Sequence, residues 1–201
     1  MELVNLLLLI GIPGSGKSSL AAQLQQISAC RIISTDSIRA QLFGDAAIQG
    51  PWLLIWREVN QQFRDAVVQI QTGQIDFAIY DATNTRRLIR RDLIALARLV
   101  GFSRIVAVWL DPPLELCCWR NHQRGRQVPE AVIQRMYRQL WSSPPRLREG
   151  IDLLLHYGTT APNSELLLQF VQPQAVATSK LRESTEIAPS QRQEPNPSFL
   201  L

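Results

Sequence analysis

Lysine is nearly absent from this 201-residue chain, since only Lys17 and Lys180 are lysines among its 21 basic residues. The other 19 basic residues are arginines, whose planar guanidinium is suited to binding phosphate. GC-rich coding produces the same bias without any function. Because the net charge is only +4, composition alone does not identify a nucleic-acid partner, and the positions of the arginines must decide.

Paired cysteines, a histidine cluster and a long apolar run are also missing. Cys30, Cys117 and Cys118 form no CxxC pair, which favours small buried thiols in the reducing cytoplasm over disulfides. Two histidines are too few to predict a zinc site. Glu2 stands before the apolar run 3–10 where a signal peptide has basic residues, and no run approaches the ~20 apolar residues of a membrane span. We therefore expect a cytoplasmic protein with no membrane partner.

Short apolar runs alternate with helical patterns along residues 1–160, which we take as one domain. Predicted strands cover 3–10, 31–34, 77–80, 105–110 and 153–156. Predicted helices cover 17–28, 36–43, 52–72, 86–100, 113–123 and 130–142. This alternation predicts an α/β fold of three layers, with a mostly parallel five-stranded sheet between helices.

The composition changes after this region. Residues 161–201 are rich in proline, glutamine and serine, and they contain no tryptophan or tyrosine. Such a segment buries too little apolar surface to offset its ordering entropy, so we predict a largely disordered tail. Ser164–Val171 is the exception, where one short helix is predicted.

The sequence GIPGSGKS, residues 11–18, matches the P-loop pattern GxxxxGK[ST] between a predicted strand and a predicted helix. Its glycines allow backbone N–H groups to surround phosphate oxygens at a helix N-terminus. Lys17 reaches the β- and γ-phosphates, and the Ser18 hydroxyl binds Mg²⁺. We predict ATP and Mg²⁺ as ligands, with nucleotide contacts from Gly11, Pro13, Gly14, Ser15, Gly16, Lys17 and Ser18.

A P-loop does not reveal what receives the γ-phosphate, although the short chain favours a small kinase. Asp36 follows the second predicted strand, so it faces the same edge of the sheet as the P-loop. Taken by itself it is either the N-cap of the next helix or a base for an acceptor hydroxyl. In the second case, Arg39 lies one turn along to hold an anionic neighbour of that hydroxyl.

Two acids compete for the metal. Asp81 ends the third predicted strand, where a carboxylate can orient Mg²⁺ or its waters, and Asp111 ends the fourth but is followed by two prolines. We favour Asp81. A basic stretch follows it at Arg86, Arg87, Arg90 and Arg91, and we assign Arg87 to the acceptor.

Residues 119–129, WRNHQRGRQVP, break one predicted helix at a glycine and restart another at a proline. An arginine-bearing turn between two helices is typical of a lid that closes over a nucleotide. Arg120 and Arg124 are our candidates for neutralising phosphate charge, with Arg124 in a catalytic role. A solvated helix connection is the alternative interpretation.

Four segments together resemble the kinase domain of polynucleotide kinases: GIPGSGKS, STDSIR, YDATNTRR and RNHQRGRQVPEAVIQRMYRQL. The resemblance covers roughly residues 4–157. The last segment is the most specific, because P-loops are shared by many families.

The resemblance implies an ATP-dependent kinase acting on a polynucleotide 5′-hydroxyl, with a nucleic-acid 5′-end as its partner. It implies that Asp36 is the general base, that Arg39 binds the adjacent acceptor phosphate and that Asp81 is an acid near the site. Lys17 and Ser18 correspond to nucleotide and metal contacts, and Arg124 corresponds to a lid arginine that contacts phosphates.

This chain departs from the family pattern at two places. Ser37 stands where a second acid commonly follows the base, and the lid is one residue shorter after its glycine, so Arg126 has no assigned counterpart. Two other functions remain open: a kinase for a sugar, antibiotic or nucleotide sugar, and a slow NTP-binding regulatory module.

Overall fold

The computed structural model describes residues 3–172, and its centre is a five-stranded sheet in the order β2-β3-β1-β4-β5. The strands are β1 (Asn5–Ile10), β2 (Cys30–Ser34), β3 (Phe77–Asp81), β4 (Arg104–Leu110) and β5 (Leu153–Tyr157). All four pairings are parallel, so the carboxyl ends of the strands share one edge. The predicted α/β class is confirmed, and the sheet is parallel throughout.

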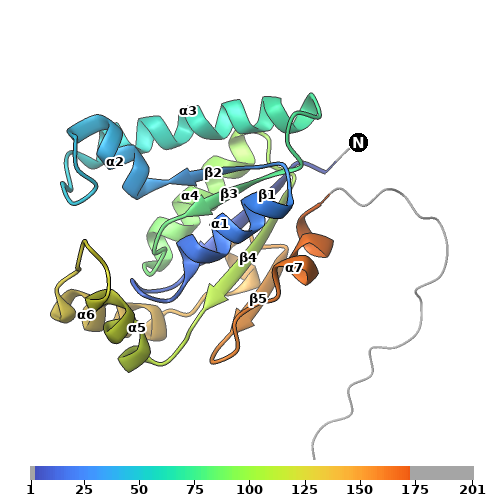
Figure 1. Cartoon of the computed structure of the whole chain (residues 1–201). Coiled ribbons are helices and arrows are strands. Elements are labelled where there is room, and N and C mark those ends of the chain that lie inside the picture. The colour runs from blue at the N-terminus through green and yellow to red at the C-terminus, as the bar shows by residue number, and fades with distance from the viewer. Residues whose placement is uncertain (1–2, 173–201) are drawn as a thin grey trace, which may run out of the picture.

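Helices cover both faces of this sheet, which gives the three layers seen in Figure 1. The helices are α1 (Lys17–Ile27), α2 (Thr35–Phe43), α3 (Trp52–Gln71), α4 (Arg87–Val100), α5 (Leu114–His122), α6 (Glu130–Ser142) and α7 (Ser164–Val171), with a 3₁₀ turn at Leu147–Glu149. One face packs against α1 and α7, and the other packs against α3 and α4. Because both faces are covered, every residue of β1 is buried, as a central parallel strand requires.

The folded region extends beyond residue 160, where we predicted the domain to end. Helix α7 packs beside α1, and its Leu167 and Val171 are fully buried. The Asn5 side chain donates to the Val171 carbonyl oxygen at 2.9 Å. The short predicted helix is therefore a part of the core, and the rest of the predicted tail, residues 173–201, lies outside the described residues.

Arg90, which belongs to the predicted basic stretch after Asp81, is a core residue. Its guanidinium is fully buried and forms a two-pronged ion pair with Glu149, at 2.9 Å for both contacts. It also donates to the carbonyl oxygens of Asn84 (3.0 Å) and Ser143 (2.8 Å). Arg90 thus joins α4, the 3₁₀ turn, the end of α6 and the loop after β3.

The cysteines are unpaired, as predicted. Cys30 and Cys117 are buried, and burial raises the pKa of both thiols, that of Cys117 to about 11. Cys118 is only half-buried, which differs from our expectation of a buried thiol. Among residues 3–172, no helix is long and apolar enough to cross a membrane.

Candidate active site

The P-loop connects the buried strand β1 to α1 at the carboxyl edge of the sheet. Gly14 and Gly16 have left-handed backbones, with φ of 83° and 99°, which a glycine adopts without steric cost. The Gly11 amide donates to the Thr83 carbonyl oxygen at 3.0 Å, which ties the loop to the segment after β3. Helix α1 begins directly after Gly16, so its free amides face the loop.

Gly14 is required by close packing as well as by its backbone angle. A Cβ atom at this position would clash with the carbonyl oxygen of Cys117 in α5. Helix α5 therefore packs directly against the P-loop backbone. This close packing leaves no room for a side chain at residue 14, and it sets the position of α5 relative to the P-loop.

Lys17 is buried, with 7% of its surface exposed, and it is held inside the loop. Its Nζ donates to the Ile12 carbonyl oxygen at 2.9 Å and to Ser15 Oγ at 3.3 Å. The pKa of Lys17 is lowered to about 8, mainly by burial; the charge of Asp81 opposes this shift and the charge of Arg124 contributes to it. A bound triphosphate would supply the negative charge that this ammonium group lacks.

ATP affinity is consequently expected to fall as the pH rises above about 8. In the ligand-free protein Lys17 loses its proton there, whereas the bound triphosphate favours the charged form, so binding takes up a proton. The Kd should rise by up to about tenfold per pH unit. Calorimetry in buffers of different ionisation enthalpy measures both the Kd and the proton uptake, and a constant Kd without uptake at about pH 9 would contradict the assignment.

Two cavities lie on either side of the P-loop, and Arg124 lines both of them. The larger has a volume of about 730 Å³, and the smaller has a volume of about 410 Å³. The larger cavity is lined by Lys17 and Ser18 of the P-loop and also by Asp36 and Asp81, which lie far from the P-loop and from each other in the sequence. The structure therefore brings the predicted donor and acceptor residues to one cavity.

Asp36 is not the N-cap of α2, so the capping alternative is wrong. Ser34 occupies the cap position, with its Oγ 3.5 Å from the Ser37 amide, and Asp36 is the second residue of the helix. The Asp36 side chain is 61% exposed and accepts a hydrogen bond from Arg39 at 2.7 Å. Its carboxylate is thus free of the backbone and faces the larger cavity.

Asp81 and Ser18 could hold a magnesium ion. Both line the larger cavity, whereas Asp111 pairs with His156 at 3.2 Å and lines neither cavity. Residues 3–172 contain no group of three or more His, Cys, Asp or Glu side chains arranged to hold a metal. Magnesium is usually bound by few protein oxygens plus waters and substrate phosphates, so a hydroxyl and one carboxylate suit it.

The structure does not bring Arg87 to the acceptor side. It lines neither cavity, and its Nε lies 4.0 Å from the buried carboxylate of Glu149. The adjacent loop is shaped instead by Asn84, whose φ is 51°. The Asn84 side chain donates to the Leu9 carbonyl oxygen at 2.6 Å, which fixes the loop that follows Asp81 against β1.

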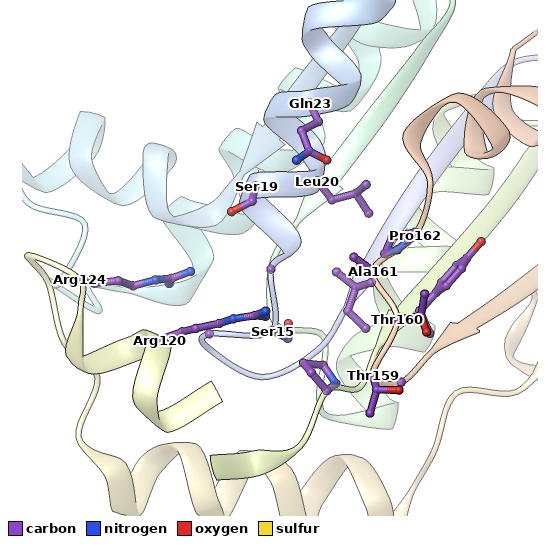
Figure 2. Close-up of a pocket in the computed structure, with 16 residues that line it drawn as sticks. Ser15, Ser19, Leu20, Gln23, Arg120, Arg124, Thr159, Thr160, Ala161 and Pro162 are labelled. Atoms are coloured by element: carbon purple, nitrogen blue, oxygen red, sulfur yellow. The ribbon is translucent and has the colours of Figure 1, made fainter. Parts of the chain in front are cut away.

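Within the predicted lid segment 119–129, residues 123–129 form a turn that connects α5 to α6; this lid turn lies over the carboxyl edge of the sheet (Figure 1). Figure 2 shows Arg120 and Arg124 extending side by side toward the P-loop. A Cβ atom built on Gly16 would lie 4.0 Å from Arg120 Nη1, so this guanidinium lies close to the cradle. Both arginines are in reach of phosphates bound there.

The far wall of the smaller cavity was not predicted from the sequence. The segment 157–162, which runs from the last residue of β5 toward α7, lines it opposite Arg120 and Arg124, and Figure 2 shows Thr159, Thr160 and Ala161 there. The segment TTAP contains no motif that could have revealed this role. Its position next to the P-loop makes the smaller cavity a candidate site for the nucleoside part of a nucleotide.

Residues 6–142 match a family described as the AAA domain, and the matched region includes the P-loop and the lid turn. The L-seryl-tRNA(Sec) kinase of Methanococcus maripaludis is 29% identical over 141 residues, which are 66% of this chain and 51% of that protein. The chain thus spans about half the length of this curated relative.

Solved structures share the fold at lower identity. A chain of the Pnkp1/Rnl/Hen1 RNA repair complex superposes with a TM-score of 0.58 at 20% identity, over 76% of this chain and 48% of that one. A gluconokinase from Sinorhizobium meliloti 1021 superposes with a TM-score of 0.55 at 16% identity, over 85% and 91%. Since the family match spans most of residues 3–172, this chain belongs to the AAA-domain family, with its P-loop and lid turn inside the matched region.

Proposed function

We propose that this protein is an ATP-dependent kinase that transfers the γ-phosphate to the 5′-hydroxyl of a polynucleotide. One observation supports this most directly. A single cavity is lined by the P-loop residues Lys17 and Ser18 and also by the hydrogen-bonded pair Asp36–Arg39. A phosphate donor bound in the cradle would therefore meet an acceptor beside a carboxylate.

In the proposed reaction, the acceptor oxygen attacks the γ-phosphorus while Asp36 takes the hydroxyl proton. The bond between the γ-phosphorus and the bridging oxygen breaks, and that oxygen leaves with ADP. Phosphoryl transfer has a loose transition state, so positioning and charge neutralisation supply most of the acceleration. Lys17 and Arg124, which line the cavity, would stabilise the negative charge on the transferring phosphoryl group. Ser18 and Asp81 would hold Mg²⁺, which would neutralise charge on the phosphate oxygens.

The charges of the larger cavity favour an anionic acceptor over a neutral one. Five of its lining residues are cationic and two are anionic, a net charge of +3. The cationic residues are Lys17, Arg39, Arg124, Arg126 and Arg135. The net negative charge of a triphosphate with its bound Mg²⁺ would balance part of this positive excess. Arg39 and Arg126, however, lie beside Asp36, where we propose that the acceptor binds.

The curated relative supports a second candidate, an amino-acid hydroxyl carried on a tRNA. Its name describes a kinase for L-seryl-tRNA(Sec), in which the acceptor hydroxyl is attached to RNA. The same cavity chemistry serves both candidates, because each acceptor carries phosphates. This chain covers only about half of the seryl-tRNA kinase and of the RNA repair chain, so the substrates of these proteins are not assigned to it directly.

Radiolabelled ATP offered to a set of acceptors tests the proposal. We expect label to appear on 5′-hydroxyl DNA or RNA oligonucleotides, and not on the same oligonucleotides that already carry a 5′-phosphate. The set should include seryl-tRNA, gluconate and other small alcohols, because the fold is shared with a gluconokinase. Label on a small alcohol alone would replace our proposal with a metabolite kinase, and slow ATP hydrolysis without any acceptor would favour a regulatory module.

A further inference from the structure

A third cavity lies between α3 and α4 and shares no lining residue with the two cavities beside the P-loop. Its volume is about 300 Å³. It is lined by Trp52, Leu53 and Trp56 from α3 and by Ile89 and Asp92 from α4. The centroids of the two indole rings are 5.9 Å apart, and the ring planes are inclined at 38°. The wall is therefore mostly aromatic and apolar, with a single carboxylate.

Trp52 is exposed although it continues the buried side of α3. It lies one turn before Ile55 and two turns before Val59, and both of these residues are fully buried in the core. Trp52 itself is 42% exposed, and the adjacent Leu53 is 76% exposed. A cluster of exposed apolar side chains of this kind marks a surface that binds something. No element among residues 3–172 covers it, so a ligand can reach the two indoles.

Both walls of the third cavity continue from segments that line the larger cavity, and both helices begin at the carboxyl edge of the sheet (Figure 1). Gln49 lines the larger cavity, and Trp52 follows it by three residues. Because a chain spans at most about 3.6 Å per residue, the Cα atoms of Gln49 and Trp52 are no more than about 11 Å apart. On the other wall, Thr83 lines the larger cavity and α4 begins four residues later. A strand bound beside Asp36 can therefore reach the indoles within a few nucleotides.

On both helices, an exposed arginine stands next to a residue of the third cavity. Arg57 follows Trp56 in α3, and Arg91 precedes Asp92 in α4. Neither arginine forms an ion pair among residues 3–172. Aromatic rings that stack bases, combined with cations that bind phosphates, are typical of sites for single-stranded nucleic acid. A purely apolar protein partner would not need these cations.

Asp92 adds a hydrogen-bond acceptor to the aromatic wall. Its carboxylate forms no ion pair among the residues that the structure describes. A carboxylate accepts a hydrogen bond from the exocyclic amino group of cytosine, adenine or guanine. Thymine and uracil have a carbonyl oxygen in place of the amino group of cytosine, and a carboxylate repels it. The wall therefore favours a base that carries an amino group.

We propose that the third cavity binds a nucleobase of the acceptor strand, a few nucleotides from its 5′-hydroxyl, with the base against Trp52 and Trp56 and its amino group toward Asp92. This inference rests on the proposed function and adds to it that the acceptor end is single-stranded, because a base that stacks on the indoles has left the duplex. Stacking tolerates every base, so most of the affinity is independent of sequence, and the amino group adds a preference.

Binding of short 5′-hydroxyl oligocytidylates, of DNA and of RNA, tests the site without turnover when a non-hydrolysable ATP analogue and Mg²⁺ are present. The base is removed from one internal nucleotide at a time. In the wild-type protein, removal at one position near the 5′-end should weaken binding about tenfold. The double variant Trp52→Leu with Trp56→Leu should bind the intact oligonucleotide about tenfold more weakly and should not respond to that removal.

Two further variants separate stacking from folding. Trp141→Leu changes a tryptophan on α6 that is 49% exposed and lines none of the three cavities, so it should respond to base removal as the wild type does. The double variant Trp52→Phe with Trp56→Phe keeps two flat rings and should retain part of the affinity that the leucines lose. Leucines that bind as tightly as phenylalanines would mean that apolar burial, and not stacking, is what the position requires, and would overturn the proposal.

The carboxylate has its own test. Thymine in place of cytosine at the sensitive position of the DNA oligonucleotide should weaken binding about fivefold in the wild type, and it should have no such effect in Asp92→Ala. An equal effect of thymine in both proteins would remove Asp92 from the site.

Other results would overturn the site as a whole. One is a wild-type affinity that depends on no internal base, and another is the same dependence in the wild type and the leucine double variant. Sedimentation equilibrium measures the remaining alternative. A wild-type dimer that becomes a monomer in the leucine double variant, with unchanged oligonucleotide affinity, would make this surface an interface between copies of the chain.

The proposed function and the base site can fail separately. Base-dependent binding that is lost in the leucine double variant, without transfer of label to any oligonucleotide, supports the site and contradicts the kinase assignment. Transfer of label with the same base dependence in that variant contradicts the site and leaves the kinase assignment in place.

Discussion

Asp36→Asn is expected to lower kcat by roughly 10²–10⁴-fold and to leave the Kd for ATP within about twofold of the wild type. The amide has nearly the shape of the carboxylate and can still accept a hydrogen bond from Arg39, but it cannot take up the hydroxyl proton. ATP affinity should survive because we assign the triphosphate to Lys17 and the P-loop amides, which this substitution does not change.

Two controls support the interpretation of this variant. Glu165→Gln changes an exposed glutamate on α7 that lines none of the three cavities, so its kcat should equal that of the wild type. Single-turnover measurements of the Asp36→Asn protein separate chemistry from product release. If the single-turnover rate constant were unchanged, the only role of Asp36 would be to pair with Arg39 and Arg126, and another group would have to accept the proton.

Arg90→Met should lower the free energy of unfolding by about 3–5 kcal/mol, a large part of the stability of a typical domain. The substitution leaves the Glu149 carboxylate buried without its partner and removes donors from the carbonyl oxygens of Asn84 and Ser143. Chemical denaturation followed by circular dichroism measures the change.

The matched controls are Arg91→Met and the double variant Arg90→Met with Glu149→Met. Arg91 is exposed on the same helix, so its loss should change the unfolding free energy by less than about 0.5 kcal/mol. The double variant should be more stable than Arg90→Met alone, because no uncompensated charge remains buried. Equal stability of Arg90→Met and Arg91→Met would mean that the buried pair contributes nothing.

The P-loop and the order of strands and helices were predictable because they depend on local pattern. Residues 11–18 match their motif in full, and the apolar runs before and after them have lengths typical of buried parallel strands. Each predicted strand overlaps an observed one, and its bounds shift by two residues at most. Such features involve neighbouring residues, so the sequence contains the information directly.

The roles of individual charged residues were less predictable. Arg87, Arg90 and Arg91 are neighbours in one basic stretch, yet one lies near Glu149, one is buried against it and one is exposed. The partner, Glu149, lies 59 residues away from Arg90 in the sequence. No spacing rule connects these two positions, because their contact depends on how α4 packs against the 3₁₀ turn.

The same distinction applies to the site. The sequence alone determined that a triphosphate cradle follows β1 and that Asp36, Asp81 and Arg124 are candidates around it. Only the tertiary structure decided that Ser34 and not Asp36 caps α2, that segment 157–162 lines the smaller cavity and that Arg126 pairs with Asp36. The physical reason is separation in the sequence. A motif depends on interactions among neighbouring residues, whereas these contacts join strand ends and turns that meet only after the sheet has formed.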